Sequence, residues 1–104
     1  MKLLTKEIEN SIPELGKQDG LGHDAIAYVK FFMPDGAWTW YATEYDPKER
    51  TFFGLVDGFE KELGYFYLDE LESARGMLGL PIERDLYFKP TKLSELTKEV
   101  SDAS

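Results

Sequence analysis

The sequence predicts an α+β fold: an antiparallel meander sheet of four or five strands with short helices packed on one face. Aromatic and β-branched residues dominate the middle of the chain, where Ala25 to Met33 (AIAYVKFFM) and Trp38 to Tyr45 (WTWYATEY) flank a turn-forming segment. Apolar residues recur at helical spacing near both ends. Short turns separate the strand-like segments, so strands that are neighbours in sequence are expected to pair.

The N-terminal segment predicts a short amphipathic helix. Its apolar side chains recur every four residues, at Leu4, Ile8 and Ile12. Thr5 is suited to cap this helix, and Pro13 ends it. Residues 14–24 contain three glycines and several polar side chains, which predicts a flexible loop.

Four strands are expected in the middle of the chain. Turns around Pro34 to Ala37 and Pro47 to Arg50 separate the first three of them. The expected strands cover residues 25–33, 38–45, 51–57 and 59–67.

Two more elements and a C-terminal helix follow. Asp69 and Glu72 have the spacing of a capping box, which predicts a helix that ends close to Gly76. Its inward side chains would be Leu71, Ala74 and Leu78. A last strand is expected over residues 83–88. The C-terminal helix would then carry Leu93, Leu96 and Val100 on one side.

The four-residue loop at 34–37 determines how the first two strands pair. One face of this hairpin would be wholly apolar and is expected to belong to the core: Met33 with Trp38, Phe31 with Trp40, and Val29 with Ala42. The opposite face would hold Phe32 with Thr39, Lys30 with Tyr41, and Tyr28 with Thr43. Because side chains alternate along a strand, a slip of one residue would exchange the faces, and their clean segregation supports this register.

The same register, extended to the third strand, assigns alternate residues of that strand to the two faces. The core face beside Ala42 would receive Phe53 and Leu55. The second face would receive Phe52 and Val56, near Tyr45 and Tyr41.

The second face is the main candidate for a binding surface. It would gather five aromatic side chains around one cation: Tyr28, Phe32, Tyr41, Tyr45 and Phe52 around Lys30. Aromatic sheet faces stack bases in single-strand binders, and they also form protein interfaces. A helix or the C-terminal segment could instead cover this face and make it a second layer of core. The residues themselves leave these three interpretations open.

The charge of the chain bears on its partner. The 20 acidic and 12 basic side chains give a net charge of −8, which disfavours direct nucleic-acid binding, because phosphates bind clustered Lys and Arg. An acidic surface can mimic DNA and occupy a basic groove, although negative charge also keeps small proteins in solution. Arg84 lies between Glu83 and Asp85 and is either part of surface ion pairs or an interface anchor.

The sequence offers little catalytic or metal chemistry. It contains no Cys, which excludes disulfides, thiolate zinc sites and thiol nucleophiles. His23 is the only histidine, and the chain has no nucleophile elbow and no phosphate-binding loop. Five carboxylates are candidates for a hard-cation site, although no D-x-D-x-D-G run is present: Glu44, Asp46, Glu60, Glu62 and Asp85. We therefore assign no catalytic residue, no cofactor and no metal ligand.

The composition predicts one cytoplasmic domain over residues 1–104, with residues 101–104 disordered. The lack of cysteine fits a reducing compartment. No membrane association is expected, because the apolar runs are far shorter than the ~20 residues of a membrane helix. Charged residues follow the first four residues too closely for a signal peptide. The oligomeric state is left open.

Three long segments resemble a known family: YVKFFMPDGAWTWYATEYD (Tyr28 to Asp46), TFFGLVDGFEKELGYFYLDEL (Thr51 to Leu71) and LGLPIERDLYFKPTKLSEL (Leu78 to Leu96). Over nearly its whole length the chain is similar to the bacterial domain-of-unknown-function family 2958. Its members are small proteins often encoded on plasmids, integrative conjugative elements and phage-like regions. The family has no assigned catalytic or binding residues, so none carries over. The resemblance implies a mobile-element accessory protein, a setting in which small acidic proteins sometimes antagonise restriction or other defence systems.

Three functional hypotheses follow. The first is a non-enzymatic protein-interaction module that binds an unidentified protein through the aromatic second face or its acidic rim. The second is an acidic DNA mimic that antagonises a host restriction or defence nuclease. The third is a small carboxylate-dependent hydrolase or nuclease.

Overall fold

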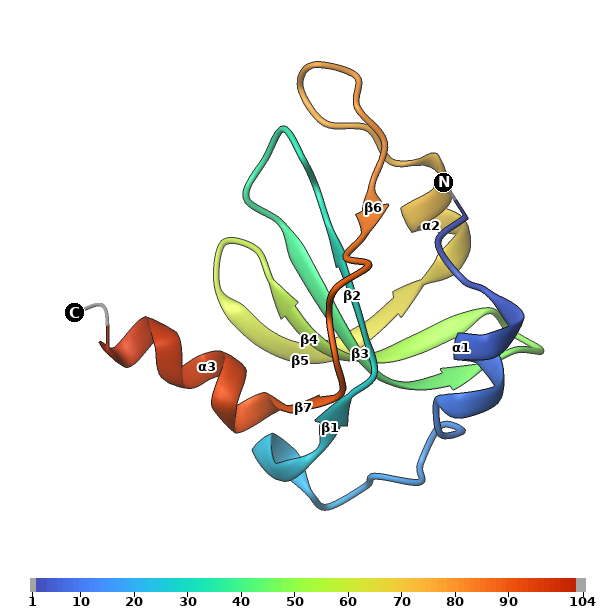
Figure 1. Cartoon of the computed structure of the whole chain (residues 1–104), viewed down its shortest axis with the longest axis vertical. Helices are drawn as coiled ribbons and strands as arrows, with labels where there is room; N and C mark the ends of the chain where they lie inside the picture. Colours follow the sequence, from blue (N-terminus) through green and yellow to red (C-terminus); the bar gives the residue numbers. More distant parts are fainter. Residues whose placement is uncertain (1, 103–104) are drawn as a thin grey trace.

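The computed structural model describes residues 2–102, with side chains up to residue 97, and shows an α+β fold with two antiparallel sheets (Figure 1). The larger sheet has five strands in the order β5-β4-β3-β2-β6, and the smaller sheet pairs β1 with β7. The strands are β1 (Ile26–Ala27), β2 (Val29–Phe32), β3 (Thr39–Asp46), β4 (Thr51–Asp57), β5 (Lys61–Tyr67), β6 (Glu83–Arg84) and β7 (Thr91–Lys92). The helices are α1 (Lys6–Ser11), the 3-10 turn η1 (Gly22–Asp24), α2 (Leu68–Ser73) and α3 (Leu93–Asp102).

The expected register of the first hairpin is confirmed. β2 and β3 pair Val29 with Ala42, Lys30 with Tyr41, Phe31 with Trp40, and Phe32 with Thr39. The backbone N–H of Met33 donates to the carbonyl of Trp38 at 3.0 Å, which closes the hairpin at the expected four-residue loop. The predicted strand 25–33 is interrupted at Tyr28, so its first part becomes the separate strand β1.

The expected faces of the third strand are wrong, because β3 contains a β-bulge. Near the turn the pairing follows the prediction, with Tyr45 opposite Phe52, but the register shifts between Ala42 and Glu44. Thr43 is the extra residue, and beyond it Ala42 pairs with Gly54 instead of Leu55. One inserted residue reverses which side chains point to which face of the sheet. Tyr45 and Phe52 therefore lie on the face of Ala42, while Phe53 and Leu55 lie on the opposite face.

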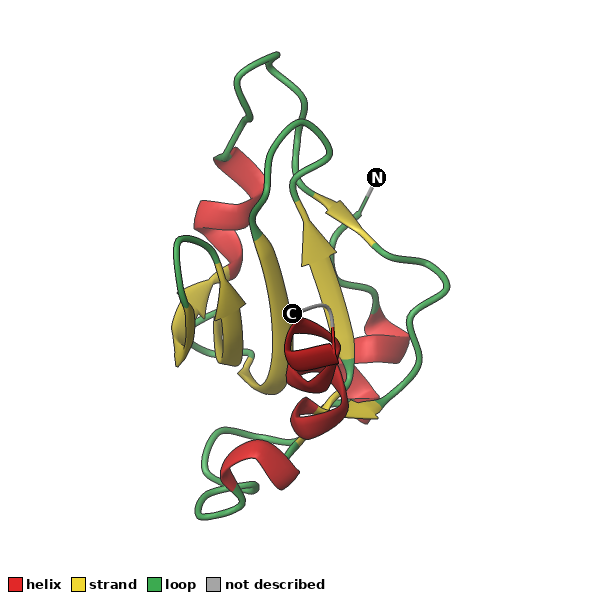
Figure 2. Ribbon diagram, turned by 90° about the vertical axis from the view of Figure 1, so that its left-hand side faces the viewer, coloured by secondary structure: helices red, strands yellow, loops and turns green. Residues whose placement is uncertain are grey.

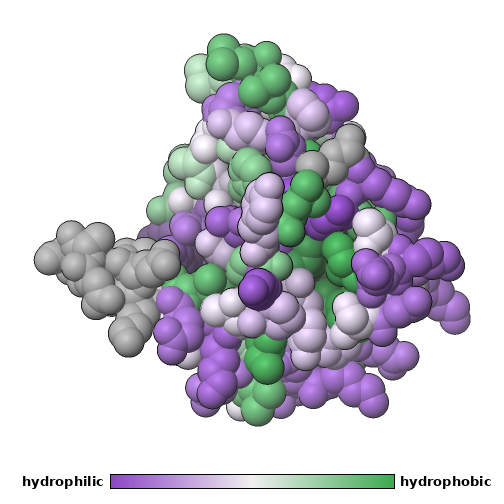
Figure 3. Space-filling view, viewed as in Figure 1, coloured by the Kyte–Doolittle hydropathy of each residue, from purple (hydrophilic) through white to green (hydrophobic). Residues whose placement is uncertain are grey.

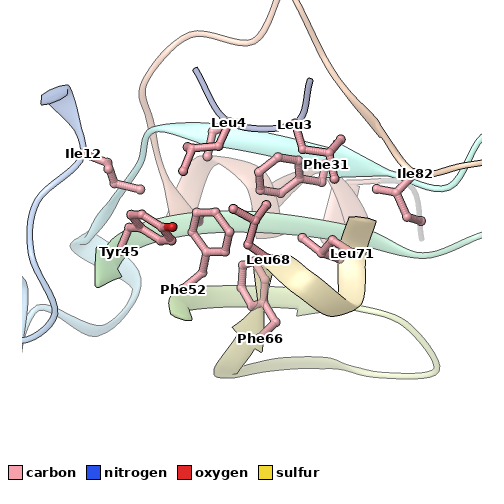
Figure 4. Packing of buried hydrophobic residues seen from close by; sticks show 12 residues of the cluster. Leu3, Leu4, Ile12, Phe31, Tyr45, Phe52, Phe66, Leu68, Leu71 and Ile82 are labelled. Carbon is pink, nitrogen blue, oxygen red and sulfur yellow. The ribbon is translucent and has the colours of Figure 1, made fainter. Parts of the chain in front are cut away.

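We call the face that carries Phe31 and Phe52 the inner face. It is covered by the N-terminal segment, α1 and α2, which run along one side of the sheet in Figure 1. Figure 4 shows the resulting core, in which side chains of the sheet meet leucines and isoleucines from these segments. The buried members of this core are Leu3, Leu4, Ile12, Val29, Phe31, Ala42, Tyr45, Phe52, Phe66, Leu68, Leu71 and Ile82.

We call the opposite face, which carries Lys30, Tyr41, Phe53 and Leu55, the outer face. A smaller buried cluster covers only part of it, formed by Leu55 with Ala25, Ala27 and Leu93. These partners come from β1, its flanking loop and the start of α3, and Figure 2 shows α3 in front of this part of the molecule. The helices thus pack on both sides of the sheet and not on one face alone.

The predicted helix starts differ in outcome. Thr5 caps α1 as expected, since its hydroxyl oxygen accepts the N–H of Ile8 at 3.2 Å. The capping box expected for α2 is absent, because Tyr67 is the residue before the helix and its side chain makes no capping hydrogen bond. α2 ends at Ser73, so Leu78 lies beyond it and is 81% exposed instead of facing the core.

The last predicted strand is shorter than expected, and the C-terminal helix is only partly described. The expected strand 83–88 is limited to Glu83 and Arg84 in β6. The C-terminal helix is present, with Leu93 buried and Leu96 packed beside it, whereas the Val100 side chain lies outside the described residues. Disorder was expected at 101–104; α3 includes residues 101 and 102, and residues 103 and 104 lie outside the described residues. No helix within residues 2–102 has the length and apolar character needed to cross a bilayer.

Candidate functional site

The bulge in β3 splits the aromatic surface expected on the second face. Some of its side chains lie on the inner face of the sheet and others on the outer face. Tyr45 and Phe52 are 2% and 0% exposed, respectively, so their expected place on an open surface is wrong. The ring of Phe52 lies 4.5 Å from that of Tyr45 and 5.3 Å from those of Phe31 and Phe66 (Figure 4). These rings form the centre of the core.

Burial changes the acidity of Tyr45. Loss of solvent around the phenol raises the pKa of Tyr45 above its ordinary value of 10.0, and the positive charge of Arg50 lowers it in part. Arg50 lies in the β3–β4 turn with a φ of 53°, a left-handed conformation that is uncommon for a residue other than glycine. Its guanidinium donates to Asp69 at 2.7 Å and to Glu72 at 2.9 Å, so the two acids expected to cap α2 bind Arg50 instead.

Lys30 and Tyr41 remain on the outer face, but each is half-buried against neighbours. The Lys30 ammonium lies 3.6 Å from the Asp85 carboxylate and 5.8 Å from the centre of the Tyr41 ring. The Tyr41 ring packs 6.0 Å from that of Phe88, in the segment between β6 and β7. This segment therefore covers part of the outer face near Tyr41, which the sequence analysis treated as a candidate binding surface.

Tyr28 and Phe32 are also half-buried. Tyr28 packs against the inner core instead of sharing a surface with Tyr41. Lys30 and the five aromatic residues predicted around it therefore do not form one exposed patch.

Arg84 holds the N-terminal segment. One nitrogen of its guanidinium, Nη1, donates to the carbonyls of Lys2 at 2.6 Å and Leu3 at 3.0 Å. These bonds fix the backbone beside Leu3 and Leu4, which are both buried in the inner core. The structure thus gives Arg84 a contact within the chain.

The exposed apolar surface of the outer face lies on β5 and the neighbouring part of β4. Leu63, Tyr65 and Tyr67 are 40%, 63% and 47% exposed, respectively. Tyr65 pairs with Phe53 across the strands, and their rings meet edge to face at 5.0 Å. We call these four residues the β5 surface. Sequence reasoning missed it, although the period-two spacing of Leu63, Tyr65 and Tyr67 was a usable signal once β5 was paired with β4.

A pocket of about 340 Å³ continues the β5 surface toward the bulge. Phe53, Leu63 and Leu93 provide its apolar lining, and Gln18, Thr43 and Glu44 lie at its polar side. A pocket of this size and lining can hold one large side chain of a bound protein. We call it the outer-face pocket.

The polar side of the outer-face pocket is a connected hydrogen-bond network. Glu44 is 3% exposed, and its carboxylate accepts the backbone N–H groups of Gly16 at 2.8 Å and Gln18 at 2.7 Å. The Gln18 amide donates to the carbonyls of Thr43 and Ile26 and accepts the N–H of Ile26. The network fastens the loop that was expected to be flexible onto the bulge, and the Gln18 amide satisfies the carbonyl of Thr43, the extra residue of the bulge.

The carboxylates considered for a cation site do not gather. Glu44 binds loop amides, Asp46 accepts the N–H of Lys48 at 2.9 Å, and Asp85 pairs with Lys30. Within the described part of the chain, no group of three or more His, Cys, Asp or Glu side chains is arranged to hold a metal ion.

A second exposed apolar feature is the loop between α2 and β6, at the top of Figures 1 and 3. Met77 and Leu78 are 96% and 81% exposed. The Asp35 carboxylate, from the β2–β3 turn, accepts the N–H groups of Leu78 at 2.7 Å and Leu80 at 3.4 Å. Two turns far apart in sequence are thereby joined at one end of the molecule.

Comparison with known proteins gives a family match, which covers nearly the whole chain. The sequence model of a family described as a protein of unknown function (DUF2958) matches residues 3–103. The chain belongs to the DUF2958 family. No curated protein and no solved structure matches it. The DUF2958 description names no activity, so the geometry of this chain carries the functional argument.

Proposed function

We propose that the protein is a non-enzymatic interaction module that binds another protein through the β5 surface and the outer-face pocket. The supporting observation is the exposure of Leu63, Tyr65 and Tyr67 on one face of a regular strand. Exposed aromatic side chains beside an apolar pocket are the usual centre of a protein interface, because they bury much area at small entropic cost. The proposal keeps the predicted function and replaces the predicted residues.

The alternatives have weaker support. Several acids already bind groups of the chain itself: Asp57 pairs with Lys61, Asp85 with Lys30, and Asp69 with Arg50. Such acids are less suited to imitate a row of phosphates for a restriction or defence nuclease. A carboxylate-dependent hydrolase would need converging acids, which the described residues do not provide. We also propose that the protein acts in the cytoplasm and has an accessory role on mobile elements.

The test is capture of partners from cells that naturally carry the protein. The variant Tyr65→Thr with Tyr67→Thr removes both rings and keeps β-branched residues suited to a strand. Tyr87→Thr is the matched control, since Tyr87 is 90% exposed and lies outside the β5 surface. We expect the double variant to lose at least ~10-fold of the captured protein, the control to lose none, and both to unfold at the wild-type temperature. Equal capture by all three proteins would contradict the proposal.

A further inference from the structure

The two edges of the five-stranded sheet differ in a way that suggests how a partner binds. β6, at one edge, has two residues, whereas β5, at the other edge, has seven residues paired with β4 without a register shift. Natural sheets protect their edges with short strands, bulges, prolines or charges, because an open edge recruits further strands. β6 is short, but β5 has no charge and no proline from Leu63 to Tyr67.

The backbone of β5 is oriented to accept another strand. The N–H of Leu68 donates to the carbonyl of Arg50 at 3.0 Å, which continues the β4–β5 ladder by one position. In an antiparallel ladder, residues alternate between pointing their backbone groups toward and away from the partner strand. The N–H and C=O groups of Leu63, Tyr65 and Tyr67 consequently point away from β4. No described strand occupies that side of β5.

The charges along β5 indicate the chemistry of the occupant. Glu60, Glu62 and Glu70 are exposed at the two ends of the strand, while Lys61 is paired with Asp57 at 3.8 Å. On the inner side of β5, an added Cβ on Gly64 would meet no atom within 4 Å, so this side of the strand is open at Gly64, next to the exposed Glu62. An added strand would therefore meet apolar rings on one face and a carboxylate on the other. A second copy of the chain would bring another net charge of −8 to this edge, which disfavours it.

We propose that β5 binds an extended segment of another protein as a sixth strand, and that this segment alternates apolar and basic residues. The inference rests on the proposed function, since it specifies how the β5 surface is used. The apolar side chains of the segment would cover Leu63, Tyr65 and Tyr67, and its cations would face Glu62. Backbone hydrogen bonds provide affinity in this binding mode, and the alternating side chains provide selectivity.

The first experiment measures binding of short labelled peptides to the intact protein by fluorescence anisotropy. One peptide alternates Val and Lys over about seven residues, the length of β5, and a second has the same composition with the valines and lysines in separate blocks. We expect the alternating peptide to bind at least ~10-fold more tightly than the block peptide, because only alternation segregates the two chemistries. Tyr65→Thr with Tyr67→Thr should weaken this binding by at least ~10-fold, and Tyr87→Thr should leave it unchanged.

The second experiment tests the backbone directly. Two further peptides carry N-methyl groups either on all valines or on all lysines, and each set removes the donors from one edge of the peptide strand. Strand addition predicts that one set abolishes binding while the other is tolerated, because only one edge of the peptide contacts β5. Equal binding of the two sets would contradict strand addition, and so would failure of every peptide to bind.

The outcomes separate the two proposals. Loss of host-partner capture by the tyrosine variant, together with equal binding of both methylated peptides, would support the interaction surface and overturn strand addition. No effect of the tyrosine variant in either assay would overturn both. A wild-type dimer in light scattering that the tyrosine variant converts to monomer would identify a second copy as the occupant and contradict the peptide proposal.

Discussion

Gly54 shows how tightly the centre of the sheet is packed. Gly54 and Gly64 are cross-strand partners in β4 and β5. A Cβ on Gly54 would overlap the backbone carbonyl of Tyr41, whereas a Cβ on Gly64 would meet no atom within 4 Å. Backbone atoms of a central strand cannot move aside as a flexible side chain can.

This contrast gives a matched pair of variants. We expect Gly54→Ala to lower the free energy of unfolding by at least about 2 kcal/mol, because the overlap forces β3 and β4 apart. Gly64→Ala should be neutral or stabilising by about 0.5 kcal/mol, because alanine reduces the entropy of the unfolded chain. Urea unfolding followed by circular dichroism measures both. Equal losses in the two variants would contradict the packing at Gly54.

Tyr45 links stability to alkaline pH. Its phenol has a raised pKa in the folded protein and the ordinary value of 10.0 when unfolded. The stabilisation from the buried neutral form is therefore complete below pH 10 and is lost as the pH rises through the raised pKa of the folded state. Tyr45→Phe removes the titrating group and keeps the ring. We expect the stability of wild type relative to Tyr45→Phe to be constant below pH 10 and to fall as the pH rises above 10, as measured by urea unfolding at each pH. A constant difference would contradict the pKa shift.

At the scale of elements, the bulge in β3 depends on a loop that lies far away in the sequence. Glu44 accepts two loop N–H groups, and the Gln18 amide donates to the carbonyls of Thr43 in the bulge and Ile26 in β1. We expect Glu44→Ala to cost about 2 kcal/mol, because it removes two hydrogen bonds to a charged group and leaves their donors without this acceptor. Hydrogen exchange should accelerate at the amides of Gly16 and Gln18.

The control for this experiment is Glu14→Ala, an exposed acid in the same loop. It should change the free energy of unfolding by less than about 0.5 kcal/mol and leave the two amides protected. Acceleration of the same amides in both variants would mean that the loop responds to charge in general and not to the Glu44 contact.

The elements that the sequence predicted well are those determined by nearby residues. The β2–β3 register follows from a tight loop and the segregation of apolar side chains, and the α1 cap follows from one threonine. The bulge could not be predicted in this way, because the carbonyl of Thr43 is satisfied by Gln18, which lies 25 residues away in the sequence. The capping-box spacing at Asp69 and Glu72 was misleading because the distant Arg50 binds both acids.

The predicted binding surface was wrong for the same reason, because it was derived without the bulge that Gln18 supports. A regular register that continues past Thr43 predicts Tyr45 and Phe52 on the open face, and the bulge at Thr43 moves them to the inner face. Tyr65 and Tyr67 were overlooked because the register was not continued to β5. Composition correctly indicated an aromatic sheet. Which rings are exposed depends on the register of each successive strand pair, because one shift in register changes the faces of all strands that follow.

For the whole molecule, coverage of the sheet is uneven. Two helices and the N-terminal segment cover the inner face, and Arg84 holds that segment in place. On the outer face, the buried cluster around Leu55 and Leu93 leaves the β5 surface exposed. The exposed residues thus lie at one edge of an otherwise well-packed sheet, which is where a rigid scaffold can present a binding surface.

The extra residue at Thr43 has a consequence for the evolution of this chain. A relative that lacks Thr43 could keep the same core, because Ala42 would still lie opposite Gly54, Glu44 opposite Phe53 and Tyr45 opposite Phe52 in a regular ladder. A deletion of this residue should therefore remove the bulge without compensating changes at Tyr45 and Phe52. Alignments of the family need to allow a gap here, since an ungapped comparison would equate interior positions with surface positions.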